Sequence, residues 1–213
     1  QPLPSTEIKI MGENNSITRF KEIGKIFARG PQVMGGYLND ASSSMKVLSI
    51  DGWFDTGDLG FLIPNGSLII TGRSKDTIVL TSGENIEPNP LEAKILSSIF
   101  ISQVQLVGQD KKNLSALVVP NIDLIESKFS VTDLIEINEN KEIRNFYKSK
   151  INKLLKNRIG ARLEEQIIDC LFVSPFTIEN SLLTQTLKQK RKEIEKLYEI
   201  QIEEMYKKQV KRE

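Results

Sequence analysis

The chain has 213 residues, with 29 basic and 28 acidic side chains and a formal net charge of +1. This length can bury a sizeable core and leaves room for one large or two small domains. The balanced charge argues against bulk electrostatic capture of nucleic acid, and no apolar run approaches the roughly 20 residues of a transmembrane helix.

Histidine is absent and cysteine occurs once. The lack of histidine excludes a histidine-based acid–base pair, a Ser-His triad and a His-ligated zinc site within the chain. Cys170 has no second cysteine to pair with, which fits a reducing cytosol. It lies in the apolar run 167–173, which favours buried packing over a nucleophilic role. The sequence starts at Gln1 with neither an initiator methionine nor a signal pattern, so we expect it to be cut from a longer protein.

The first part of the chain is predicted to be β-rich, because short apolar stretches alternate with glycines. Asp40 can cap a helix over residues 40–48, and Pro64-Asn65-Gly66 is typical of a hairpin turn. The predicted strands cover residues 7–11, 25–29, 59–63 and 68–71.

After Arg73 the pattern becomes a mixture of strands and helices. A proline in the first turn marks a short helix over residues 90–98. Helical spacing predicts a long helix over residues 132–163, with Gly160 near its end, and a charged terminal helix is expected over residues 190–210. The predicted strands of this part cover residues 77–80, 103–107, 116–119 and 166–173.

Five sequence blocks carry the functional signal. They are Gly-Pro-Gln-Val-Met-Gly-Gly-Tyr at 30–37, Gly-Trp-Phe-Asp-Thr-Gly-Asp at 52–58, Thr-Gly-Arg-Ser-Lys-Asp at 71–76, Ser-Gly-Glu-Asn-Ile-Glu-Pro at 82–88 and Leu-Thr-Gln-Thr-Leu-Lys-Gln-Lys-Arg at 183–191. Each block alone is a weak signal, but five in this order and spacing are strong. Together they resemble the adenylate-forming superfamily of acyl-CoA synthetases, luciferases and peptide-synthetase adenylation domains.

The resemblance implies an α+β chain of two parts. Residues 1–74 would form a β-rich, distorted antiparallel, barrel-like subdomain at the C-terminal end of the large adenylating domain. Residues 75–213 would form a small mobile α+β C-terminal domain, with the hinge at Lys75 and Asp76. Rotation about a few loop residues is a known way to exchange catalytic groups within one site. From the residues alone, Lys75 could equally be a solvated loop residue.

Asp58 and Arg73 are the candidate nucleotide-binding residues. Thr-Gly-Asp is ordinary turn chemistry, and a lone arginine is usually a surface ion-pair partner. A carboxylate can also accept a hydrogen bond from each hydroxyl of a ribose. Arg73 follows Asp58 after one hairpin, and the resemblance assigns Asp58 to the ribose and Arg73 to a second nucleotide contact.

Gly83 and Glu84 lie in the loop after the strand that follows the hinge. A tight turn with positive φ is a sufficient structural reason for Gly83. In the resembled family this loop faces the nucleotide after the domain has rotated, and its glycine borders the tunnel for the pantetheine arm. Both explanations can hold together.

Lys188 is the candidate catalytic residue. The basic run 188–192 is by itself typical of a solvated helix start. The resemblance places one lysine of this segment in the active site during adenylation, where its ammonium would lower the repulsion between the attacking carboxylate and the α-phosphate of ATP. The alignment favours Lys188 over Lys190, and Gln185 stands where long-chain members often have proline.

The resemblance implies the C-terminal portion of an ATP-dependent, AMP-forming long-chain fatty acid ligase. The amino-acid sequences of the motifs at residues 54–58 and 84–92 are most similar to those of long-chain members. The enzyme would make an acyl-adenylate and transfer the acyl group to coenzyme A or acyl carrier protein. The family's phosphate loop, its magnesium-holding glutamate block and its acyl pocket are not among these residues. We therefore expect the fragment to be inactive alone and to require the missing N-terminal part of the same enzyme, with no metal ligands here.

Two alternatives stay open. The chain could belong to an adenylating domain for an amino or aryl acid, which the acyl pocket would decide. It could also be a non-catalytic, nucleotide-binding truncated paralogue, which an in-frame phosphate loop would argue against. We expect a cytoplasmic location. The basic terminal helix could attach peripherally to a membrane, although a solvated helix is the simpler interpretation.

Overall fold

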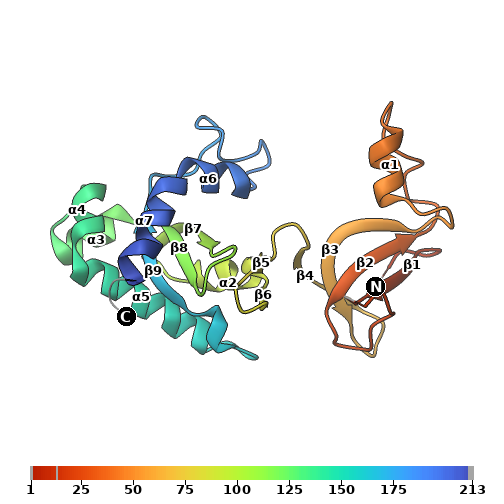
Figure 1. Ribbon diagram of the computed structural model, residues 1–213, viewed down its shortest axis with the longest axis horizontal. Coiled ribbons are helices and arrows are strands. Elements are labelled where there is room, and N and C mark those ends of the chain that lie inside the picture. Colours follow the sequence, from red (N-terminus) through yellow and green to blue (C-terminus); the bar gives the residue numbers. More distant parts are fainter. Residues whose placement is uncertain (1, 13, 211–213) are drawn as a thin grey trace. The chain divides into compact units, whose positions relative to one another are not determined.

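The computed structural model describes residues 2–12 and 14–210. The chain divides into two compact units, Gln1–Thr77 and Ile78–Glu213, and Figure 1 draws their helices and strands in sequence colours. Both helices and antiparallel strands are present, which confirms the predicted α+β class.

The first unit is built on an antiparallel sheet with the strand order β1-β2-β3-β4. In the part of the chain that the structure describes, β1 and β4 are the two edges and do not pair with each other. Closing a barrel requires such a pairing, so the sheet is open and the expected barrel-like closure is wrong. The strands are β1 Glu7–Met11, β2 Gly24–Arg29, β3 Phe54–Leu62 and β4 Leu68–Arg73.

The long strand β3 and its hairpin to β4 carry the nucleotide-binding candidates. The predicted turn is confirmed: Gly66 has φ +78° and donates its N–H to the Ile63 carbonyl at 2.8 Å. β3 begins earlier than predicted, because the strand accommodates Gly57 at φ +71° where the sequence suggested a break. At Gly60 a Cβ would lie 2.2 Å from the Ile69 carbonyl oxygen, so only glycine permits the approach of β4.

Helix α1 Ala41–Val47 confirms the predicted cap. The Asp40 side chain accepts the N–H of Ser43 at 2.9 Å, which satisfies one of the free donors at the helix start.

The second unit contains a three-stranded sheet in the order β7-β8-β9. β7 and β8 are antiparallel, whereas β8 and β9 are parallel. Parallel neighbours need a long crossover, and α3, α4 and α5 supply it. The elements are the hairpin of β5 Ile78–Val79 and β6 Asn85–Ile86, α2 Pro88–Ile95, β7 Ile101–Val107, β8 Leu114–Pro120, α3 Ile122–Phe129, α4 Leu134–Glu139, α5 Lys141–Lys156, the 3-10 turn Leu163–Glu165, β9 Ile167–Phe172, α6 Arg191–Leu197 and α7 Glu199–Val210.

Both faces of this sheet are covered. One apolar cluster joins residues of α2 and α5 to one face, including Leu91, Tyr147 and Cys170. The other joins residues of α6 and α7 to the opposite face, including Leu117 and Ile194. All residues of β8 are buried, as expected of a strand that is covered on both sides.

The predicted helices of the second unit differ from the observed ones at their ends. The expected helix 132–163 is two helices, because the Asn140 side chain accepts the N–H groups of Glu142 and Ile143 and so begins α5 anew. α5 ends at Lys156, and Gly160 lies beyond it in a turn with φ +75°. The terminal helix is likewise divided at Tyr198 into α6 and α7. The helix predicted at 90–98 spans Pro88–Ile95, and neither α3 nor β6 was predicted.

Candidate functional site

Asp58 and Arg73 face each other across the β3–β4 pairing. The Arg73 Nε atom lies 2.9 Å from Asp58 Oδ1, with the two side chains 62% and 26% exposed. Thr56 fixes this stretch, since its Oγ1 donates to the Ile26 carbonyl at 2.9 Å and accepts the N–H of Asp58 at 3.1 Å. The sheet therefore holds a carboxylate and a guanidinium side by side at the end of a hairpin.

Lys75 and Asp76 follow in a tight turn. The N–H of Asp76 donates to the Arg73 carbonyl at 3.0 Å, and Ser74 donates its N–H and its hydroxyl to the Gly57 carbonyl at 2.9 and 3.2 Å. The Lys75 side chain is exposed at the corner of this turn. Ser74 is thus tied to β3, and Lys75 begins the stretch that leads out of the first unit.

Gly83 and Glu84 form the tip of the β5–β6 hairpin. Gly83 has φ +84°, and its N–H donates to the Leu80 carbonyl at 2.9 Å. A Cβ at Gly83 would meet nothing within 4 Å, so within this unit the backbone conformation alone explains the glycine. Glu84 pairs with Arg162 at 3.0 Å, and Arg162 also donates to the Asn85 carbonyl at 2.9 Å.

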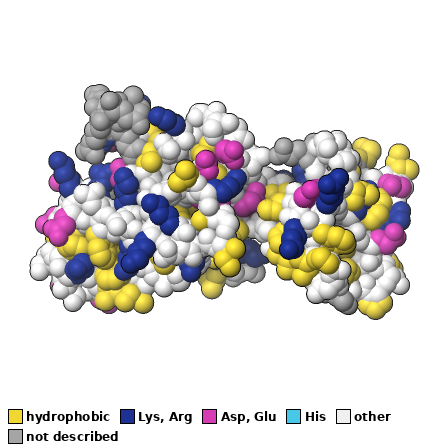
Figure 2. All heavy atoms as spheres, turned by 90° about the horizontal axis from the view of Figure 1, so that it is seen from below, with side chains coloured by type: hydrophobic (Ala, Val, Ile, Leu, Met, Phe, Trp, Pro, Cys, Tyr) yellow, Lys and Arg dark blue, Asp and Glu magenta, His cyan; other side chains and the backbone are white. Residues whose placement is uncertain are grey.

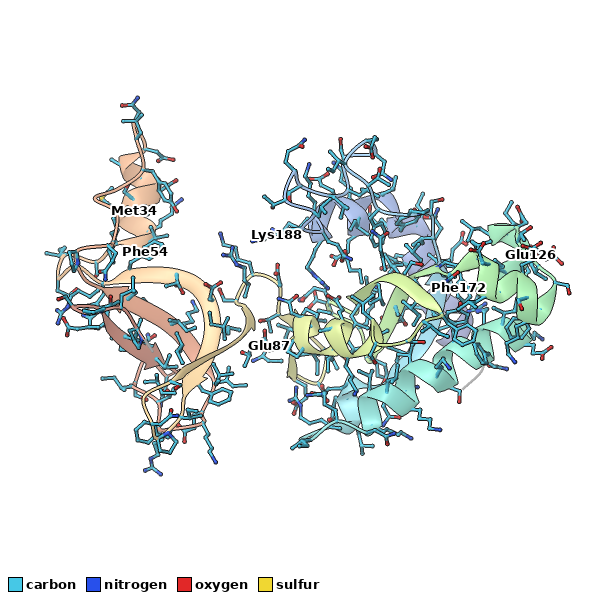
Figure 3. All side chains as sticks on the ribbon, turned by 180° about the vertical axis from the view of Figure 1, so that it is seen from behind. Met34, Phe54, Glu87, Glu126, Phe172 and Lys188 are labelled. Atoms are coloured by element: carbon cyan, nitrogen blue, oxygen red, sulfur yellow. The ribbon has the colours of Figure 1, made fainter. Side chains whose placement is uncertain are left out.

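Lys188 lies on a second hairpin, just before α6. The N–H of Thr184 donates to the Lys188 carbonyl at 2.8 Å, and the N–H of Lys188 donates to Thr184 Oγ1 at 3.1 Å. Leu187 turns the chain with φ +60°. The Lys188 side chain is exposed and projects from the surface of the second unit (Figure 3). By contrast, the alternative lysine, Lys190, sits at the N-cap of α6 and is half-buried.

A buried ion pair anchors the base of this hairpin. Arg191 Nη1 lies 2.7 and 2.9 Å from the two carboxylate oxygens of Glu92, and each side chain is 11% exposed. Both residues also hydrogen-bond the backbone of Leu106. Glu92 Oε1 accepts the N–H of Leu106 at 2.7 Å, and Arg191 Nη2 donates to the Leu106 carbonyl at 2.8 Å. This pair was not predicted, because Arg191 belongs to a basic run that is typical of a solvated helix start.

The predicted site residues fall in both units. Asp58, Arg73, Lys75 and Asp76 belong to the first, whereas the Gly83 loop and Lys188 belong to the second. Among residues 2–12 and 14–210, no group of three or more Cys, Asp or Glu side chains is placed to hold a metal ion. Burial raises the pKa of the Cys170 thiol to about 12, which opposes a nucleophilic role.

Comparison of the sequence with models of protein families shows which family the chain belongs to. Residues 75–210 match the model of the AMP-binding enzyme C-terminal domain. The chain belongs to the AMP-binding enzymes. The match begins at Lys75, in the turn between Arg73 and Asp76.

Curated relatives of this AMP-binding enzyme chain include ligases of long-chain fatty acids. It is 35% identical to a chloroplastic long-chain-fatty-acid–[acyl-carrier-protein] ligase of Arabidopsis thaliana, covering 96% of this chain and 28% of the relative. It is 37% identical to long-chain-fatty-acid–CoA ligase 5 of Mus musculus, covering 86% of this chain and 28% of the relative. A probable acyl-activating enzyme of Arabidopsis thaliana, also chloroplastic, is 33% identical over 97% of this chain and 30% of its own length. The chain thus spans less than a third of these relatives.

The same fold occurs in solved AMP-binding enzymes. The adenylation and carrier didomain of a carboxylic acid reductase from Segniliparus rugosus, solved with AMP, superposes with a TM-score of 0.83 at 20% identity. That likeness covers 98% of this chain and 29% of the didomain. Within the described residues, no helix combines the length and apolar character needed to cross a bilayer.

Proposed function

We propose that this chain is the C-terminal part of an AMP-forming long-chain fatty acid ligase. The complete enzyme would convert ATP and a fatty acid to an acyl-adenylate and pyrophosphate, and then pass the acyl group to the thiol of coenzyme A or acyl carrier protein. The observation that carries the proposal is the similarity to long-chain ligases over at least 86% of this chain. The parts of those relatives that this chain does not span would supply the phosphate cradle, the acyl pocket and the ligands of magnesium.

Asp58 and Arg73 would bind the nucleotide. Asp58 is held at the end of the β3–β4 hairpin with its carboxylate partly exposed. An ionised carboxylate can accept one hydrogen bond from each hydroxyl of a ribose. Arg73 orients that carboxylate through its Nε atom and keeps its other donors for a nucleotide oxygen. This pairing supports a ribose clamp that is formed before the nucleotide arrives.

Lys188 would act in the adenylation step. The fatty acid carboxylate must attack the α-phosphate, and the two groups repel because both are anionic. An ammonium placed between them lowers that repulsion and stabilises the charge that develops on the phosphate oxygens. The exposed position of Lys188 on an anchored hairpin supports this role, since the backbone that carries the ammonium is already fixed.

The second half-reaction would use the Gly83 loop. We infer a hinge at Lys75 and Asp76, about which the second unit rotates so that the Gly83 loop replaces Lys188 beside the nucleotide. The turn between Arg73 and Asp76 supports this, because it lies where the chain passes from one unit to the other. Such rotations complete one catalytic arrangement and then another. We also keep the cytoplasmic location as part of this proposal.

The experiment is an acid panel with the complete enzyme that contains this chain. Pyrophosphate release would be measured with ATP and a long-chain fatty acid, an amino acid or an aryl acid, followed by thioester formation with coenzyme A or acyl carrier protein. We expect release with the fatty acid and transfer to a thiol. A preference for an amino or aryl acid would contradict the proposed substrate, and no release with any acid would favour a non-catalytic chain.

A further inference from the structure

The positive charge of the second unit is concentrated on one segment. Residues 141–162 contain eight basic side chains and one acidic side chain, a net charge of +7, whereas the whole chain carries +1. The remaining residues therefore carry −6. Figure 2 shows dark blue side chains spread over the face of the second unit that α5 occupies.

All three arginines of this segment form ion pairs within the fold, whereas the lysines of α5 do not. Arg144 pairs with Asp169, and Arg158 and Arg162 pair with Glu165. Within residues 2–12 and 14–210, none of the five lysines of α5 has a carboxylate within ion-pair distance. Three of them lie around one hollow: Lys148, Lys153 and Lys156.

These lysines line an open polar hollow along α5. The hollow has a volume of about 490 Å³, and uncharged polar side chains complete it, among them Asn145, Ser149 and Asn152. Asn152 is fixed, since its amide bonds both the N–H and the carbonyl of Ile167 at 2.8 Å. The charges therefore stand around a rigid polar floor rather than on a mobile tail.

The end of this surface abuts the Gly83 loop. Arg162 contacts both Glu84 and the Asn85 carbonyl. Between α5 and Arg162 the chain exposes Ile159 completely, and Leu163 beyond it is 78% exposed. A basic hollow, two exposed apolar side chains and the loop assigned to the acceptor thiol thus form one continuous stretch.

We propose that the face of α5 with the turn 157–163 docks an acidic protein that carries the acceptor thiol on a pantetheine arm, namely acyl carrier protein. This inference rests on the proposed function, because it gives the thiol substrate of that reaction a docking surface. Complementary charge between the lysines and acidic side chains would speed the encounter. Ile159 and Leu163 would pack on apolar side chains of the carrier beside the entry of its arm.

The geometry favours a protein over the other anionic partners. Helix α5 is about 24 Å long at 1.5 Å per residue, longer than the phosphates of a single coenzyme A molecule would occupy, and those phosphates offer no cover for exposed apolar side chains. A lipid surface is flat and is contacted by side chains that protrude from a protein, whereas these lysines surround a hollow.

The test uses the complete enzyme with the three hollow lysines reversed, Lys148→Glu/Lys153→Glu/Lys156→Glu. A charge-matched control carries Lys196→Glu/Lys207→Glu/Lys208→Glu on α6 and α7, where the side chains are exposed. We expect the hollow variant to raise the KM for purified phosphopantetheinylated acyl carrier protein about tenfold to a hundredfold, because reversed charges repel the partner. The effect should shrink at high salt. Adenylation, the KM for coenzyme A and the control variant should stay unchanged.

Ile159→Ser provides a second variant that leaves the charges in place. It should raise the KM for the carrier several-fold without changing adenylation. An unchanged KM for the carrier in the hollow variant would overturn the docking surface. So would an equal rise in the KM for coenzyme A, which would assign the hollow to the nucleotide, or a loss confined to binding of phosphatidylglycerol vesicles, which would assign it to lipid.

A binding titration separates this inference from the proposed function. Labelled acyl carrier protein is titrated with the complete enzyme in the absence of ATP and fatty acid. Salt-sensitive binding that the hollow variant abolishes supports the surface even if the enzyme makes no acyl-adenylate. Missing pyrophosphate release contradicts the ligase activity alone, and missing carrier binding contradicts the docking surface.

Discussion

The carboxylate of Glu92 and the guanidinium of Arg191 form a buried ion pair, with Nη1 of Arg191 at 2.7 Å from Oε1 of Glu92. Arg191 closely follows Lys188, whereas Glu92 lies on α2, the helix that follows the Gly83 loop. The two loops that we expect to alternate beside the nucleotide are therefore anchored to one pair of side chains. Both also bond Leu106 in β7, so the anchor is tied to the central sheet.

Removing the charge of Glu92 should destabilise the second unit. Glu92→Gln keeps the shape but leaves the Arg191 guanidinium buried beside a neutral amide, and breaking a buried pair costs roughly 3–5 kcal/mol. Denaturant unfolding would measure the loss. The matched control is Glu126→Gln on α3, an exposed position where the change should be within about 0.5 kcal/mol. A loss below 1 kcal/mol for Glu92→Gln would mean that the pair adds little stability.

Asp58→Ala should weaken ATP binding in the complete enzyme. Loss of hydrogen bonds to a charged carboxylate costs roughly 1.5–3 kcal/mol, and partial exposure reduces this cost. We therefore expect the affinity for ATP to decrease by several-fold to about a hundredfold. Binding of ATP and of 2′-deoxy-ATP would be compared in both proteins. The unmutated enzyme should discriminate between them, and Asp58→Ala should not. Equal use of the two nucleotides by the unmutated enzyme would remove the ribose assignment.

Local features were predictable from the sequence, whereas pairings across long sequence distances were not. Asp40 caps α1 through a contact within its own turn, and Gly66 makes a turn that its neighbours specify. The division of the long helix at Asn140 was missed, because asparagine caps α5 without interrupting the apolar spacing. The Arg191–Glu92 pair joins residues 99 positions apart, and no local pattern marks it. The open sheet was missed because barrel closure came from the resemblance alone.

Cys170 should be unreactive in the folded protein. Burial raises the pKa of its thiol from the usual 9.0 to about 12, so little thiolate exists at neutral pH. A thiol reagent at pH 8 should modify the chain only after denaturation. Because the folded-state pKa is the higher one, the free energy of unfolding should fall as the pH rises from about 9 towards 12. Rapid modification of the native protein would contradict this burial.

The chain expressed alone should fold at least in part and yet make no acyl-adenylate. The described residues hold the Asp58–Arg73 pair and Lys188 but offer no group of ligands for a metal ion, and the five motifs do not include a phosphate loop. A triphosphate needs such a cradle of backbone N–H groups. Weak binding of AMP is compatible with this expectation. Release of pyrophosphate from ATP and fatty acid by the purified chain would contradict it.

Lys188 and Lys75 should affect different half-reactions of the complete enzyme. Lys188 is expected beside the carboxylate and the α-phosphate only while the adenylate forms, so Lys188→Ala should slow adenylation by a factor on the order of 10² or more. Thioester formation from supplied acyl-adenylate should be nearly unchanged.

Lys75→Pro should instead slow thioester formation and leave adenylation nearly unchanged, because proline fixes φ and restricts Ser74 before it, which hinders rotation at the hinge. Lys75→Ala leaves the backbone free and should support both steps, which separates the backbone effect from loss of the ammonium. The two half-reactions are measured separately for all three variants. Equal impairment of both steps by Lys188→Ala, or normal transfer by Lys75→Pro, would show that the division of roles between the two lysines is wrong.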